Sequence, residues 1–120
     1  MTPSLYQRLG GANGITELVD DIIVAHQKNP VIKTRFENIK DIAHAKQMAR
    51  QFFSAGSGGP EAYTGKDMRT AHKGMNISEQ EYLAAMDDII GAMEKHGLGQ
   101  DTKKDVLAIL YSLKGEIIRV

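Results

Sequence analysis

One histidine, His72, lies in the segment YTGKDMRTAHKGMNI, which runs from Tyr63 to Ile77 and also contains two glycines and two methionines. A neutral imidazole is a good ligand for iron, copper, zinc and nickel. His72 is therefore either an exposed or helix-capping histidine or a metal ligand. Residues 56 to 74 contain five glycines, and a loop of this length usually needs something to order it. A planar macrocycle that carries the metal would supply the missing apolar surface.

The elements that position His72 are predicted to be helices, because apolar residues recur at steps of three and four. The first long helix should follow Gly10-Gly11, end before Pro30, and bury one face: Ile15, Leu18, Val19, Ile22, Ile23 and His26. A second is expected from Asp41 to Phe53, with this apolar face: Ile42, Ala45, Met48, Ala49, Phe52 and Phe53. A short helical patch is expected from Met68 to His72.

Two more long helices should follow this segment. The capping box from Ser78 to Glu81 predicts the start of the third, which should end at Gly97. Its apolar stripe is Tyr82, Ala85, Met86, Ile89 and Met93, and its water-facing residues are Asp87, Asp88 and Glu94. The fourth should follow Asp101 and bury Val106, Leu110, Leu113 and Ile117. No segment alternates cleanly between apolar and polar residues, so we expect an all-α fold.

Length and composition narrow the class of protein. The 120 residues predict a single domain, residues 1–120. Fifteen basic and fifteen acidic side chains give a formal net charge of +0, which argues against nucleic acid or an anionic membrane as a partner. Cysteine is absent, which excludes disulfides and thiolate metal sites. Since no signal peptide or long apolar run is visible, we expect a cytoplasmic protein.

Two motifs together resemble one known family. The segment GGPEAYTGKDMRTAHKGMNIS resembles the stretch of group I truncated haemoglobins that carries the proximal histidine, and LYQRLGGANGITELVDD resembles their N-terminal segment. With Phe36, Phe52-Phe53 and Gly97, the similarity covers nearly the whole chain. It implies a truncated two-over-two globin sandwich of helices B, E, G and H around haem b, with His72 as the proximal ligand of the iron. Gly58-Gly59 matches a glycine motif of the family, whereas the corner from Glu37 to Lys40 lacks a glycine.

A haem needs apolar contact on both faces and charged groups only at its propionate edge. The expected lining residues are Met48, Phe53, Met68, Met75, Ile77, Tyr82, Met86 and Ile89, and the resemblance implies that Phe36 packs on the porphyrin. Taken singly, each methionine is as consistent with an ordinary core as with a haem pocket. The residues that either meet the propionates or remain solvated are Lys46, Tyr63, Lys66 and Arg69.

The residues expected on the distal side of the haem differ from the family pattern. Members of the family usually have a tyrosine in the middle of the B helix, where this sequence has Ile22-Ile23. Ile23 cannot donate a hydrogen bond to bound dioxygen, and such a bond contributes roughly 1–3 kcal/mol. We therefore expect oxygen to leave quickly unless His26, His44 or Gln47 donates instead.

The second helix can be aligned with the family in two ways, and each alignment places a different pair of residues on the distal side of the haem. Counting forward from Phe36 puts His44 and Met48 at the distal positions, whereas counting back from Phe52-Phe53 puts Ala45 and Ala49 there. We favour the second count, which predicts a largely apolar distal pocket lined by Ile23, His26, His44, Ala45, Gln47, Ala49 and Phe52. If His44 faced the iron, it would either hydrogen-bond the ligand or bind the iron as a sixth ligand.

The leading hypothesis for function is reversible binding of O2, CO or NO at haem iron. An alternative is an enzyme, a nitric oxide dioxygenase or a redox or gas-sensing protein with peroxidase-like side activity. It would need a separate reductase because the sequence has no flavin or nicotinamide motif. A haem-free helical interaction domain ranks lower. A small zinc or iron site ranks lowest, because no His-x-x-x-His pair is present.

Overall fold

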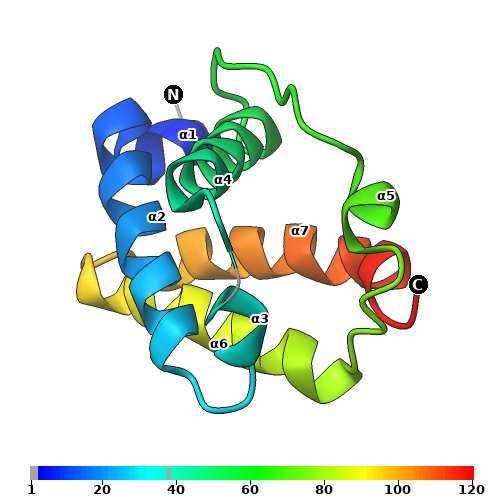
Figure 1. The fold of residues 1–120 in the computed structure, drawn as a ribbon. Helices are drawn as coiled ribbons and strands as arrows, with labels where there is room; N and C mark the ends of the chain where they lie inside the picture. The colour runs from blue at the N-terminus through cyan, green and yellow to red at the C-terminus, as the bar shows by residue number, and fades with distance from the viewer. Residues whose placement is uncertain (1–2, 38) are drawn as a thin grey trace.

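The computed structural model describes residues 3–37 and 39–120, and within them the chain forms seven helices. These are α1 (Leu5–Arg8), α2 (Gly11–Lys28), α3 (Thr34–Glu37), α4 (Ile42–Gly56), α5 (Met68–His72), α6 (Glu79–Lys95) and α7 (Gln100–Ile117). Helix α2 packs against α4 and α6, α6 packs against α7, and α5 lies beside α7 near the C-terminus (Figure 1). The predicted all-α, two-over-two arrangement is confirmed. Asn38, in the corner that lacks a glycine, lies outside the described residues.

Helix α2 supplies much of the core, and its predicted inner face is confirmed. The residues buried on it are Ile15, Leu18, Val19, Ile22, Ile23 and His26. The apolar members join residues of α4, α6 and α7, including Phe53, Ile89, Met93 and Val106, in the larger of two core clusters. The smaller cluster consists of Ile77, Tyr82 and Ile117, with Met68 and Met75 packed against it. It lies beside α5.

Helix α4 differs from the prediction. It continues to Gly56, and its buried residues are Gln51, Phe53 and Ser54, while the other predicted apolar positions are half-buried. The buried amide of Gln51 is satisfied because its Oε1 accepts from the backbone N and the hydroxyl of Thr64, at 2.9 and 2.8 Å. The polar side of α4 therefore fastens the long loop that leads to α5, and helical periodicity alone does not reveal this.

The loop is also held at Gly59, where two segments meet closely. A Cβ atom added there would lie 2.4 Å from Cδ1 of Tyr6 and 2.5 Å from Oγ of Ser54. The backbone N of Tyr6 donates to the carbonyl of Ser57 at 3.0 Å, so α1 lies directly against the end of α4. A glycine is required at this contact because no side chain fits it.

Residues after α5 are fastened by the C-terminal end of the described chain. Ile77 and Ile118 form a parallel β-bridge, and the backbone N of Arg119 donates to the carbonyl of Ile77 at 2.9 Å. The backbone N of Gly74 donates to the carbonyl of Val120 at 3.2 Å. These bonds fix the backbone that follows His72.

The start and end of α6 follow the prediction. The hydroxyl of Ser78 accepts from the backbone N of Glu81, and the carboxylate of Glu81 accepts from the backbone N of Ser78, both at 3.0 Å. Gly97 follows the C-cap with a φ of +73°. Among the described residues, no helix is long and apolar enough to cross a membrane.

Candidate functional site

His72 is the last residue of α5, a helix that begins where the side chain of Asp67 accepts from the backbone N of Thr70. Its Nδ1 lies 2.8 Å from the carbonyl oxygen of Met68, one turn earlier. A carbonyl oxygen only accepts, so Nδ1 carries the hydrogen and donates. In the neutral ring Nε2 then has a free lone pair, which is how a metal-binding histidine is commonly oriented.

His72 lines a cleft of about 200 Å³. The predicted site residues that line it are His26, Phe36, His72, Met75, Ile77 and Tyr82. Sequence reasoning missed Ile32, Arg35, Glu81, Ala85 and Ile117. The cleft therefore joins α2 and α3 to the segment around α5, and most of its walls are apolar.

A second hollow lies between α4 and the loop before α5. Its lining comprises His44, Met48, Tyr63, Thr64, Gly65, Lys66 and Ala71. Ala71 lines this hollow and His72 lines the first, so the end of α5 borders both. The hydroxyl of Tyr63 donates to the carbonyl of Lys66 at 2.6 Å, and burial raises the pKa of Tyr63.

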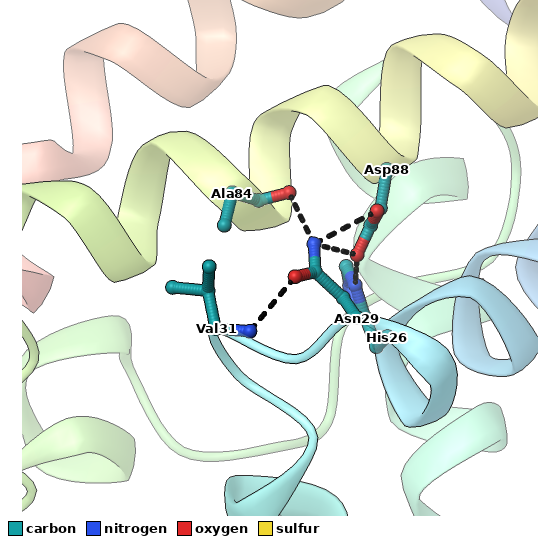
Figure 2. A network of polar contacts seen from close by, with 5 residues as sticks. All are labelled: His26, Asn29, Val31, Ala84 and Asp88. Carbon is teal, nitrogen blue, oxygen red and sulfur yellow. Dashed lines mark hydrogen bonds and ion pairs between the residues drawn. The ribbon is translucent and has the colours of Figure 1, made fainter.

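A partly buried polar network joins the C-terminal end of α2 to α6 (Figure 2), and one of its members, His26, lines the cleft. Nδ1 of His26 lies 2.8 Å from Oδ2 of Asp88, and Nδ2 of Asn29 lies 3.1 Å from both oxygens of that carboxylate. The expectation that Asp88 faces water is wrong, because its side chain is only 15% exposed. Burial lowers the pKa of His26, and Asp88 opposes this shift in part. The imidazole also stacks on Phe36, with ring centroids 5.0 Å apart.

An ion pair forms another part of the wall. Nε of Arg35 lies 2.7 Å from Oε2 of Glu81 and Nη2 lies 3.1 Å from Oε1, a bidentate arrangement. Together with the bond from the backbone N of Ser78, Arg35 lowers the pKa of Glu81 to about 2. The sequence identified Glu81 only as part of a capping box, and it held no signal for its partner on α3.

Other predicted site residues line neither the cleft nor the second hollow. Those in or against the larger core cluster are Ile23, Ala49, Phe52, Phe53, Met86 and Ile89. Lys46 lies 3.3 Å from Asp20 of α2, and Arg69 donates to the carbonyl of Gly115 at 3.4 Å. Met68 packs against the smaller cluster. Gln47 is exposed and Ala45 is half-buried.

The side chains of the cleft suit a metal ion whose other ligands come from a cofactor. In the described ranges no three His, Asp or Glu side chains gather to hold an ion. The cleft contains His72, whose ring orientation is fixed by the Met68 carbonyl, and its walls are mostly apolar apart from His26 and the Arg35–Glu81 pair. This arrangement suits iron in a porphyrin, where the macrocycle supplies four ligands and the protein one axial ligand.

Comparison with known proteins places the chain in a family. Residues 4–119 match the family model described as bacterial-like globin. The chain is 28% identical over 95 residues to a group 1 truncated hemoglobin of Tetrahymena pyriformis, covering 79% of this chain and 78% of that protein. It is 29% identical over 112 residues to the group 1 truncated hemoglobin GlbN of Synechocystis, covering 88% of each.

The fold is also similar to solved structures. The crystal structure of truncated hemoglobin from Tetrahymena pyriformis in its Fe(III) form superposes with a TM-score of 0.93 at 23% identity, covering 98% of this chain and 100% of that one. Hemoglobin from Chloroflexus aurantiacus superposes with a TM-score of 0.83 at 20% identity, covering 98% and 100%. At these identities the superpositions establish the fold alone.

Proposed function

The chain belongs to the bacterial-like globin family, and on that premise we propose that it binds haem b beside α5 and reversibly holds O2, CO or NO. His72 would be the proximal ligand of the iron. The observation that carries the proposal is the bond from Nδ1 of His72, a residue that lines the cleft, to the carbonyl of Met68, because this bond leaves Nε2 free to bind a metal. Haem supplies the iron at which the gas binds.

The other residues of the cleft have distinct roles in this proposal. The Met68 carbonyl fixes the ring orientation of His72 and makes Nε2 a better electron donor. Met75, Ile77, Tyr82 and Phe36 line the same cleft as His72, and they would pack against the porphyrin and exclude water from it. Lys66, which lines the second hollow, is a candidate to pair with a propionate.

We infer that His44 and Met48 of α4 occupy the distal positions. Both line the second hollow, whereas Ala49 packs against the larger core cluster and Ala45 lines neither hollow. These positions support the alignment of α4 that counts forward from Phe36. Met48 cannot donate a hydrogen bond, and Ile23 is buried in the core, so bound oxygen would have few donors. His44 is exposed and would have to swing inward to donate.

An absorption spectrum of the haem-loaded protein tests the proposal. Reduction followed by carbon monoxide should shift the Soret band of wild type, and His72→Ala should lose the histidine-ligated spectrum. His96→Ala is the matched control, since His96 bonds to Asp21 at 2.6 Å and lines neither cleft nor hollow. An unchanged axial ligand in His72→Ala would refute the proximal assignment. Nitric oxide turnover, which would need a separate reductase, is measurable on the same sample.

A further inference from the structure

Four cationic residues lie at the corner where α5 meets the C-terminal end of the chain. Arg69 lies on α5, Lys66 precedes this helix and Lys73 follows it, and all three residues are exposed. Arg119 is also exposed, and it reaches this corner because its backbone N donates to the carbonyl of Ile77 at 2.9 Å. Figure 1 shows the corner on the opposite side of the molecule from α2. We call these four residues the basic corner.

Among the residues that the structure describes, the cations of the basic corner pair with no carboxylate. The lysines and arginines that do form ion pairs are others: Arg8, Arg35, Lys46, Lys95 and Lys103. Nη2 of Arg69 donates to the carbonyl of Gly115 at 3.4 Å. Nη1 of Arg119 donates to the carbonyl of Asn76 at 3.5 Å. Since these contacts are with neutral groups, the charges of the corner are available to an external partner.

The two segments that meet at the basic corner carry an excess of positive charge. Residues 63–77 contain three lysines or arginines and one carboxylate, and residues 114–120 contain two and one. On the opposite side of the molecule, α2 contains three carboxylates and one lysine (Figure 1). Because the formal net charge of the whole chain is +0, this separation gives the molecule a positive end and a negative end. A compact acidic surface fits the positive end, whereas a long polyanion such as nucleic acid would also meet the negative end.

The basic corner adjoins the residues that are proposed to hold the haem. Arg69 and Lys73 flank His72 in the sequence, and His72 lines the cleft. Lys66 lines the second hollow. A protein bound at this corner would therefore lie beside the proposed ligand of the iron. Iron that has been oxidised to the ferric state binds O2 again only after it regains an electron, and the sequence has no flavin or nicotinamide motif to supply one.

We propose that the basic corner docks an electron-donor protein that has an acidic face and carries a flavin or an iron–sulfur centre. One electron passes from the reduced centre of that protein to ferric iron, which yields ferrous iron and the oxidised donor. No covalent bond forms or breaks in either protein. Opposite charges on the two surfaces raise the association rate, and salt weakens this effect. The inference rests on the proposed haem binding.

The test compares a protein donor with a donor that needs no docking surface. The ferric haem-loaded protein is mixed anaerobically with a reduced, acidic plant-type ferredoxin or with dithionite, and stopped-flow absorption gives the two rates of reduction. Electrostatic steering contributes about tenfold to such association rates at its lower end. At low ionic strength, Lys73→Glu/Arg119→Glu should therefore lower the ratio of the ferredoxin rate to the dithionite rate by about that factor. An unchanged ratio would overturn the proposal.

Matched variants separate docking from net charge and from folding. Lys28→Glu/Lys33→Glu changes the net charge by the same amount at the end of α2 and in the turn after it, where both lysines are exposed. This control should keep the wild-type ratio, and a fall equal to that of Lys73→Glu/Arg119→Glu would overturn the proposal. Lys73→Arg/Arg119→Lys preserves the charges and should also keep the ratio. If the double variant at the basic corner does not fold, Lys73→Glu alone decides the matter, since it too must lower the ratio.

A binding readout needs neither haem nor electron transfer. ¹H–¹⁵N spectra of the haem-free protein, titrated with oxidised ferredoxin at low ionic strength, should change at the amides of residues 66–77 and of Arg119. Changes confined to other surfaces, or equal changes with a DNA duplex, would overturn the proposal even if haem binds through His72. Failure of wild type to take up haem at all would instead refute the proposed function, so the two failures are distinguishable.

Discussion

Arg35 of α3 and Glu81 of α6 form a two-pronged ion pair, with Nε 2.7 Å from Oε2 and Nη2 3.1 Å from Oε1. The pair joins the short helix that carries Phe36 to the helix that carries Tyr82. Both side chains are partly shielded, at 31% and 19% exposure. The relative placement of two walls of the cleft therefore depends on this contact.

Acidification should weaken the fold through Glu81. Its pKa falls from 4.5 to about 2 in the folded protein, so its contribution to stability is complete above pH 4.5 and is lost as the pH falls toward 2. After allowance for solvent screening, we expect a loss of about 1–2 kcal/mol in the free energy of unfolding. Urea unfolding at a series of pH values should show this loss in wild type but not in Glu81→Gln. Glu79→Gln, exposed in the same first turn, should retain it.

Gly59→Ala should destabilise the protein by about 1–3 kcal/mol, because its Cβ would overlap the ring of Tyr6 and the hydroxyl of Ser54. Gly56→Ala is the control, since an added Cβ there meets nothing within 4 Å. It should leave the free energy of unfolding unchanged or raise it slightly. Equal stability of the two variants would show that the contact between α1 and the loop after α4 is looser than described.

Met48→Gln should slow oxygen dissociation about tenfold, because it places an amide donor in the second hollow with little change in volume, and one such bond contributes about 1.4 kcal/mol. Ala45→Gln, three residues away on the same helix, should change the rate much less. Stopped-flow measurement of oxygen dissociation from the haem-loaded variants decides between the two registers of α4. A larger effect in Ala45→Gln would favour the count back from Phe52-Phe53.

Tyr82→Phe should lower the free energy of unfolding by about 1 kcal/mol. The Tyr82 hydroxyl is buried and donates to the carbonyl of Leu110 at 2.5 Å, joining α6 to α7. Tyr111→Phe is the control, because Tyr111 is 63% exposed. Equilibrium urea unfolding measures both variants. If the two losses were equal, the bond to Leu110 would contribute nothing to stability.

Sequence reasoning succeeded where burial follows local periodicity. The inner face of α2, from Ile15 to His26, was predicted residue by residue, because one helix face against one core repeats every three or four positions. The start of α6 at the Ser78 capping box and its end near Gly97 are also predictable from the sequence, since both depend on residues a few positions apart. The short helix that carries His72 is likewise predicted from its local sequence.

The parts that sequence reasoning missed involve partners far apart in the chain. Helical periodicity leaves Asp88 off the apolar stripe and predicts that it faces water, yet its carboxylate contacts His26, 62 positions away in the sequence. Gln51 and Ser54 are buried because a later loop bonds to them, which no helical pattern reports. The ion pair between Arg35 and Glu81 joins positions 46 residues apart, and no local pattern predicts it.

The β-bridge between Ile77 and Ile118 has a consequence for biosynthesis. The strand-like stretch after His72 receives its backbone partners from residues that leave the ribosome much later, long after α2 and α4 have emerged. A nascent chain would therefore expose a loosely held imidazole until α7 and the residues after it are complete. If the proposed haem site is correct, haem would bind only after α7 is complete, and a shortened chain would lack these backbone bonds.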